Sequence, residues 1–525
     1  MSNVYFKTSV LVFALLASRP AAAQLTDQVQ APNAENAGIA KSLEQQIGVG
    51  VGDIATPNSS SFIVARDPAR AVRRGRQLFQ LKFTPQQGLG PRANNSVGSI
   101  EQNPAIGAGI SDSCAGCHGR PRGSAGFGGD VVTRPDSRDA PHLFGLGLKE
   151  MLADEMTTEL RRIRASARRE AARTGATVTQ ALNAKGVNFG RISAAADGSV
   201  DTSAVRGVDP DLRVKPFFAH GGTATIREFV VGAFNDEMGL QAVDSLLARA
   251  AGGEAVTTPT GMQINGATDT VAKPKAQYPM DDPDGDGIRN EVPAALVDYM
   301  EFYLFNYFKP GRYQQTPLAR VGLELMRASA CTSCHVQNLR VDRDRRVADV
   351  ETRHDPARGI FNDLFATAAL QIAARDDGSG FPALKIPNNN AFPVENIFTD
   401  FKRHDIGPGF YERNYDGSLR KEFLTTPLWG VGSTGPYGHD GRSINLREVI
   451  LRHGGEAQAS RHAFAALPEL AKLAVIEYLN TLVLFPPDDT ASNLDPGDAN
   501  NPNFPQRGHG SIKLTVLFNN PFDPE

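Results

Sequence analysis

Two short cysteine motifs constrain this chain more than any other feature. The pattern Cys-x-x-Cys-His occurs as Cys114-Ala-Gly-Cys117-His118 and again as Cys331-Thr-Ser-Cys334-His335, and together the two copies use all four cysteines. This spacing lets two thiols form thioether bonds to one haem while the adjacent imidazole reaches its iron. The motifs therefore predict two covalently attached haem c groups. The alternatives are a zinc site or a thioredoxin-like redox pair, but neither requires a histidine directly after each cysteine pair.

Length and composition agree with a globular protein that encloses large cofactors. A chain of 525 residues is long enough for two or three domains, each with its own interior. Its hydrophobic content of 41% and charged content of 22% are ordinary for such a protein. The net charge of -3 shows no electrostatic preference for nucleic acid, so we expect no nucleic-acid partner.

The N-terminus has the pattern of a secretory signal. Lys7 precedes an apolar run from Val10 to Ala17, and three alanines end at Ala23. We therefore expect residues 1–23 to be a signal peptide, cleaved near Ala23. A membrane anchor is the alternative, but the run is shorter than the roughly 20 apolar residues that span a bilayer. The expected product is an exported protein with no stable membrane span.

The expected fold is mainly α, with two c-type cytochrome domains, long loops and little β-structure. We expect a flexible lead-in over residues 24–60, an N-terminal haem c domain with insertions over 61–309, a C-terminal haem c domain over 310–485 and a tail over 486–525.

Three segments give more detailed expectations. Residues 145–175 are rich in Ala, Glu, Arg and Leu and predict a long solvated helix. Residues 468–482 predict the last helix of the second domain, with Leu470, Leu473, Ile476 and Leu479 spaced to face a core. Alternating apolar residues over 511–518 predict a short strand.

An acidic segment lies between the two motifs. Asp282, Asp284 and Asp286 alternate before Gly287, as at the start of a calcium-binding loop with oxygen ligands. The standard loop has Glu at its twelfth position and this chain does not, so an acidic turn is the alternative. We predict calcium at the three aspartates, with help from Asn290 or Glu291.

Further segments surround the two motifs in a fixed order. These are Gly88-Leu-Gly-Pro91, Ala140-Pro-His-Leu-Phe-Gly-Leu-Gly-Leu148, Asn235-Asp-Glu-Met-Gly239, Arg403-His-Asp-Ile-Gly-Pro-Gly409, Thr426-Pro-Leu-Trp-Gly430 and Gly435-Pro-Tyr-Gly-His-Asp-Gly-Arg442. Over nearly the whole mature chain, the sequence thereby resembles the bacterial di-haem cytochrome c peroxidase superfamily. It is most similar to the branch of di-haem oxidoreductases that are often labelled thiol oxidoreductases.

The resemblance implies a periplasmic oxidoreductase in which the second haem receives electrons and the first reduces peroxide. It implies a small electron-donor protein, a cytochrome c or a copper protein, as partner. Two alternatives remain open. One is a di-haem dioxygenase resembling the rubber oxygenases, which uses dioxygen, and the other is a plain electron-transfer cytochrome with both irons six-coordinate.

The resemblance also implies roles for single residues. Glu237 matches the distal acid–base group at the first haem, with His220 as a second polar group of that pocket. His453 matches the sixth ligand of the second haem, which is methionine in many relatives. His404 and His439 match segments that pack near the second haem.

Two departures from the family bear on function. Residues 119–140 contain no histidine to block the first haem, which implies an open iron at rest. The tryptophan that relatives place before the Glu-Met-Gly segment is also absent. Trp429 is the sole tryptophan, so we assign no relay role from the family.

Overall fold

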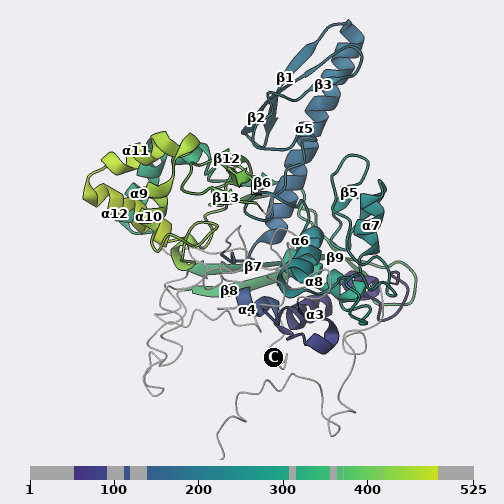
Figure 1. Cartoon of the computed structure of the whole chain (residues 1–525). Coiled ribbons are helices and arrows are strands. Elements are labelled where there is room, and N and C mark those ends of the chain that lie inside the picture. The colour runs from purple at the N-terminus through teal and green to yellow at the C-terminus, as the bar shows by residue number, and fades with distance from the viewer. Residues whose placement is uncertain are drawn as a thin grey trace, which may run out of the picture.

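The computed structural model describes seven stretches of the chain, shown in colour in Figure 1. They are residues 52–90, 111–118, 139–306, 315–354, 364–370, 372–414 and 417–482. The expected signal peptide, the C-terminal tail and the strand predicted over 511–518 lie outside the described residues. Among the described helices, none combines the length and apolar character that crossing a bilayer would require.

Helices form most of the regular structure. The α-helices are α2 (Ser60–Arg66), α3 (Pro68–Gln80), α4 (Cys114–His118), α5 (Leu146–Thr174), α6 (Ile226–Ala233), α7 (Ser245–Ala251), α8 (Ala294–Asn306), α9 (Pro317–Ala328), α10 (Leu446–Arg452), α11 (Gln458–Ala466) and α12 (Glu469–Asn480). Two shorter elements matter below, the π-helical turn η5 (Phe234–Met238) and the 3₁₀ turn η6 (Cys331–Ser333).

The strands form small antiparallel sheets. One sheet has three strands, β1 (Val178–Ala184), β2 (Val187–Ala194) and β3 (Val200–Asp201). The others are pairs: β4 (Ala255–Thr257) with β5 (Gln263–Asn265), β6 (Leu339–Val341) with β11 (Phe392–Val394), β7 (Ala348–His354) with β8 (Leu364–Leu370), β9 (Ile372–Arg375) with β10 (Leu384–Pro387), β12 (Arg403–Asp405) with β15 (Glu422–Leu424), and β13 (Glu412–Arg413) with β14 (Leu419–Arg420). The prediction of a mainly α chain is consistent with this arrangement.

The long helix predicted over residues 145–175 is α5, bounded by Gly145 and Gly175 in left-handed conformation. The prediction that it is solvated holds only for its C-terminal half. Its N-terminal half, as far as Leu160, contributes most of its buried side chains. The C-terminal half and β1–β3 project together from the body as an arm (Figure 1), and Arg162, Arg168, Arg169 and Arg173 of this half are exposed.

Two hydrophobic cores organise the described residues. The larger core gathers side chains of α3, α5, α6 and α8, and it includes Ile397, Phe401 and Trp429 from the second half of the chain. The smaller core lies between α9 and α12, with Phe398, Leu446 and Phe464 around it. The proposed domain boundaries stay a prediction.

The orientation of α12 differs in part from the expectation. Leu479 is buried as predicted, whereas Leu470 and Leu473 are 68% and 53% exposed. Ala474, Val475 and Tyr478 take the buried face instead. The reason is a close helix contact, because a Cβ atom on Gly322 of α9 would lie 1.9 Å from the carbonyl oxygen of Ala474. The small residues set which face of α12 meets α9.

Candidate functional site

The first cysteine motif forms the short helix α4. The Nδ1 atom of His118 lies 2.7 Å from the carbonyl oxygen of Pro141. Burial lowers the pKa of His118 to about 4, so the ring is neutral at pH 7 and donates its Nδ1–H to that carbonyl. This arrangement fixes the tautomer and leaves Nε2 as the ring nitrogen for a metal. The four cysteines form no disulfide, so all of their sulfur atoms are available for attachment.

Glu237 lies on a turn that is connected through Phe83 to the residues just before the first motif. Its π-helical turn η5 continues directly from α6, and such turns are frequent at functional sites. The ring of Phe234 in η5 packs edge-on against Phe83 at 5.9 Å between centroids. The backbone amide of Phe83 donates to the carbonyl of Asp112, two residues before Cys114. The structure thus brings the half-buried Glu237 and the first motif into one neighbourhood.

A glycine contact holds this turn in place. Gly239 ends η5 with a φ of 71°, and a Cβ atom there would lie 2.2 Å from the carbonyl oxygen of Gly90. The amide of Gly90 in turn donates to the carbonyl of Met238 at 3.1 Å. The resembling segments around Gly88 and Glu237 are therefore in direct contact.

Aromatic packing against α6, the helix that leads into η5, positions His220. Its ring stacks with Phe218 at 6.1 Å, and Phe218 packs against Phe229 of α6 at 5.2 Å. Because α6 leads into η5, His220 and Glu237 are attached to one structural unit. Phe217 packs on Phe229 as well, at 5.8 Å.

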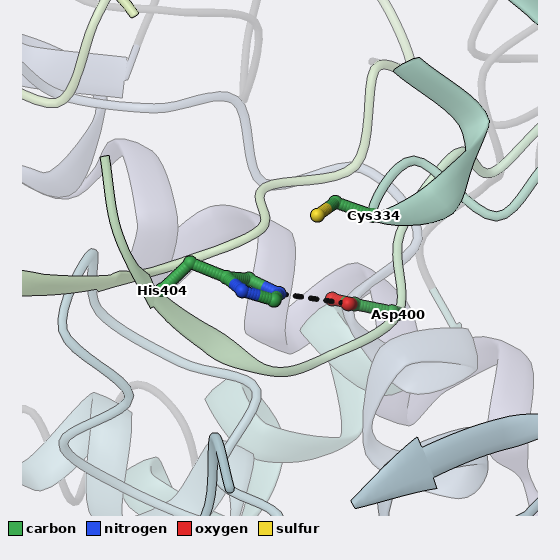
Figure 2. A group of neighbouring side chains, drawn as sticks. All are labelled: Cys334, Asp400 and His404. Carbon is green, nitrogen blue, oxygen red and sulfur yellow. Dashed lines mark hydrogen bonds and ion pairs between the residues drawn. The ribbon is translucent and has the colours of Figure 1, made fainter. Parts of the chain in front are cut away.

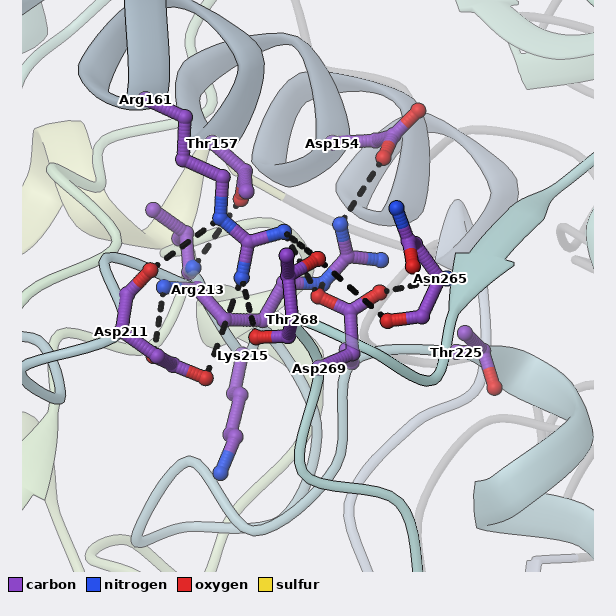
Figure 3. A network of polar contacts seen from close by, with 12 residues as sticks. Asp154, Thr157, Arg161, Asp211, Arg213, Lys215, Thr225, Asn265, Thr268 and Asp269 are labelled. Atoms are coloured by element: carbon purple, nitrogen blue, oxygen red, sulfur yellow. Dashed lines mark hydrogen bonds and ion pairs between the residues drawn. The ribbon is translucent and has the colours of Figure 1, made fainter. Parts of the chain in front are cut away.

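A polar network fixes the segment that precedes Phe217 (Figure 3). Arg161 of α5 forms an ion pair with Asp269 at 2.7 Å, and Arg213 forms one with Asp154 of α5 at 3.1 Å. The amide of Val214 donates to Thr157 Oγ1 at 3.0 Å. These contacts join the base of the arm to the chain that leads to Phe217 and His220.

Lys149 is a charged residue near the first motif that the sequence analysis did not identify. Burial lowers its pKa to about 8, and its Nζ lies 5.4 Å from the ring centre of Phe217. Burial, followed by the positive charge of Lys149, lowers the pKa of His142 to about 3. The available signal was a lone lysine within the apolar stretch that opens α5.

The second motif repeats the histidine geometry of the first. His335 follows η6, and its Nδ1 lies 3.1 Å from the carbonyl oxygen of Phe398. Its pKa is lowered to about 4, first by burial and then by the interaction with His453. His453 is thus close enough to interact with His335. Its own Nδ1 lies 2.7 Å from the carbonyl oxygen of Val449, and its ring packs edge-on against Phe410 at 5.3 Å.

His404 makes a different set of contacts beside this motif. Cys334, Asp400 and His404 form a cluster whose ligand atoms lie within 4.8 Å of one another (Figure 2). Both ring nitrogens of His404 are used, Nε2 by Asp400 at 2.8 Å and Nδ1 by Glu456 at 2.9 Å. Burial opposes the charged ring, but Asp400, Cys334 and Glu456 together raise its pKa to about 11.

His439 also has close neighbours of its own. Its ring stacks on Phe423 at 4.1 Å, and its Nε2 lies 3.4 Å from a carboxylate oxygen of Glu412. Its carbonyl accepts from the amide of Asp139, near the loop that contacts His118. These contacts suit a supporting role for His439.

The sole tryptophan packs between the two motifs. Trp429 is 5% exposed, and a Cβ atom on Gly145 would lie 2.6 Å from its ring. The neighbouring amide of Leu428 donates to the carbonyl of Ile397 at 3.1 Å. Trp429 therefore lies between the segment that contacts His118 and the segment that contacts His335. The sequence analysis assigned it no relay role, because the tryptophan of the relatives occupies a different place in the sequence.

The three aspartates of the acidic segment also lie close together in the fold. Carboxylate oxygens of Asp282, Asp284 and Asp286 lie within 4.8 Å of one another. This convergence is compatible with the calcium prediction.

Comparison with known proteins matches one part of the chain to a family. Residues 317–482 match the family described as "Di-haem oxidoreductase, putative peroxidase". No curated protein matches the chain. A solved structure of Kuenenia stuttgartiensis hydrazine synthase, pressurized with 20 bar xenon, is 15% identical, with a TM-score of 0.21. The match covers 36% of this chain and 55% of that one, so this chain spans little more than half of its length.

Proposed function

We propose, on the premise that residues 317–482 are a segment of the di-haem oxidoreductase family, that the chain is a periplasmic di-haem c-type oxidoreductase with peroxidase-like activity. The proposal rests on the orientation of three histidine rings. His118, His335 and His453 each direct Nδ1 to a backbone carbonyl, as metal-binding histidines do. The donor sets therefore fit haem at both motifs.

The attachment residues follow from the two motifs. Cys114, Cys117 and His118 would hold the first haem, and Cys331, Cys334 and His335 the second. His453 supplies a second imidazole beside His335, which supports electron uptake at the second motif. The haems supply the redox chemistry, with two electrons from a small cytochrome c or copper protein reducing peroxide to two waters.

Glu237 moves the protons that this reaction needs. Cleavage of hydrogen peroxide requires a base that takes the proton from one oxygen and an acid that returns it to the leaving oxygen, and one carboxyl group can do both. Two further protons from solvent complete the two waters. Phe217 and Phe218 exclude bulk water from the pocket, and His220 is the second polar group in it.

The substitution Glu237→Gln tests the proposal, since it keeps the shape of the side chain and removes its titratable group. Peroxide turnover with a reduced donor cytochrome should fall at least about tenfold, while both haems still load. Asp236→Asn is the matched control, because Asp236 is an exposed carboxylate on the same turn. Wild-type turnover by the Glu237→Gln variant would exclude the catalytic role.

The same preparation separates the alternatives. Binding of cyanide or carbon monoxide to one iron is expected, and its absence at both irons would favour the plain electron carrier. Consumption of dioxygen without turnover of peroxide would favour the dioxygenase.

A further inference from the structure

The acidic segment of residues 280–291 folds so that alternate side chains converge. Gly285 and Gly287 adopt φ values of 70° and 88°, which glycine permits without strain. Asp282 Oδ2 accepts from the amide of Gly287 at 3.1 Å, and Asp286 Oδ1 accepts from the amide of Ile288 at 2.6 Å. These bonds orient Asp282 and Asp286, and carboxylate oxygens of these two residues and of Asp284 lie within 4.8 Å of one another.

Buried oxygens that lack hydrogen-bond partners point to a missing cation. Asp284 is 2% exposed, and within the described residues neither of its carboxylate oxygens has a hydrogen-bond partner. Glu291 is 4% exposed, and the same is true of its Oε1. The side-chain oxygen of Asn290 is also buried without a described partner. Burying ionised oxygens without compensation is costly, so such groups are paired or bind metals.

The charges around these oxygens repel one another. The pKa of Glu291 is raised to about 8, first by burial and then by the negative charges of Asp284, Asp286 and Asp282, while the hydrogen bond from the amide of Gln241 lowers it. Burial also raises the pKa of Asp284, as do the charges of Asp286 and Asp282. A bound cation would turn this repulsion into attraction.

We propose that this loop binds one calcium ion through side-chain oxygens of Asp282, Asp284, Asp286, Asn290 and Glu291, and that the ion positions the turn that carries Glu237. Hard oxygen donors of this number and charge suit calcium, which takes six to eight oxygens. Counted from Asp282, the aspartates hold positions one, three and five of a calcium loop, and Asn290 holds position nine. Glu291, at position ten, supplies the carboxylate that standard loops place at position twelve.

Glu291 connects the loop to the candidate catalytic turn. Its Oε2 accepts from the amide of Gln241 at 2.8 Å, two residues beyond Gly239. Its side chain also fills the space beside Gly88, where a Cβ atom would lie 2.4 Å from Glu291 Cδ. The amide of Val243 donates to the carbonyl of Val292 at 2.9 Å. The end of the loop therefore contacts both the segment of Gly88 and the segment of Gln241 and Val243, which lie beside the turn of Glu237. The positioning of this turn by the ion rests on the proposed function of Glu237.

Calcium binding is measured first, on the haem-loaded protein after treatment with a chelator. Calorimetry with calcium chloride should find one site per chain, and calcium should raise the melting temperature by mass action. Asp284→Asn should weaken binding at least tenfold. Asp281→Asn is the matched control, because Asp281 only caps the backbone amides of Gln277 and Tyr278, and it should bind as wild type does. Absence of binding to the wild-type protein would overturn the proposal.

Hydrogen exchange then tests the positioning step without using activity. Calcium should slow amide exchange in a peptide that spans residues 234–243, and Asp284→Asn should remove this effect. Calcium binding with unchanged exchange would overturn the positioning role. Calcium-dependent exchange in a protein whose turnover does not depend on Glu237 would instead refute the proposed function and leave the calcium site standing.

Discussion

At the scale of single residues, the contacts of each histidine separate ligands from supporting groups. His118, His335 and His453 each direct Nδ1 to a backbone carbonyl and leave Nε2 for the proposed iron, whereas His404 has a carboxylate at each ring nitrogen. A ring that is held by two carboxylates is kept charged, and a charged imidazole cannot bind a metal. We therefore expect His404 to support the proposed second haem site and not to bind its iron.

The role of His453 can be tested by spectroscopy. His453→Ala should convert one low-spin haem signal to high-spin, because the second iron loses its sixth ligand. His453→Met should keep the low-spin signal and raise the reduction potential, since methionine ligation raises the potential of c-type haems. His462→Ala is the control, because His462 is exposed on α11. An unchanged spectrum for His453→Ala would exclude the assignment.

At the scale of elements, glycines let helices approach one another closely around α8. Added Cβ atoms on Gly75 of α3 and Gly147 of α5 would lie 2.2 and 2.0 Å from carbonyl oxygens of α8, those of Tyr299 and Phe305. Because neighbours enclose α8 on several sides, even its Asp298 and Glu301 are buried, and both pair with Arg227. Arg227 lies on α6, which continues into the turn of Glu237, so this buried ion-pair network connects α8 to the candidate site.

Glu150 links two of these elements and has a predictable effect on pH stability. Its Oε2 accepts from the amide of Ile226 at the start of α6, at 2.7 Å. Burial raises its pKa from 4.5 to about 7, although Arg345 lowers it. Because the folded pKa exceeds the unfolded one, the folded state binds more protons between these pH values. Stability should therefore fall as pH rises from about 4.5 to 7, by up to about 3 kcal/mol.

The substitution Glu150→Gln checks this slope. The amide keeps an oxygen acceptor for Ile226 and does not titrate, so unfolding by denaturant should lose that part of its pH dependence. Glu170→Gln on the exposed part of α5 should keep the wild-type slope between pH 4.5 and 7, because the hydrogen bond from Arg173 lowers the pKa of Glu170 below this range. Equal slopes in the wild-type protein and the Glu150→Gln variant would contradict the prediction.

At the scale of the whole molecule, two covalent haems are expected on one chain. The protein should therefore keep its colour on a denaturing gel, and its mass should exceed that of the polypeptide by two haems. Replacing Cys331 and Cys334 together with alanine should remove one covalent haem and leave the first. A bare polypeptide mass for protein made with haem-attachment machinery would refute both attachments.

The sequence by itself determined what depends on local spacing. The cysteine motifs, the helix over residues 145–175 and the alternate aspartates are patterns within a few turns of chain, and their chemistry does not need distant residues. The resemblance added expectations for Glu237, His220 and His453, which stay predictions.

Only the tertiary structure decided which distant groups meet. Three kinds of contact join parts of the chain that the sequence order separates. They are the carbonyls that face His118 and His335, the packing of Trp429 on Gly145, and the contacts of Glu291 with Gly88 and Gln241. The buried faces of α5 and α12 were also decided by neighbours, because close packing at glycines overrides the apolar spacing of a single helix. The chemistry of a motif depends on residues that are close in sequence, whereas burial and long-range contacts depend on how the whole chain packs.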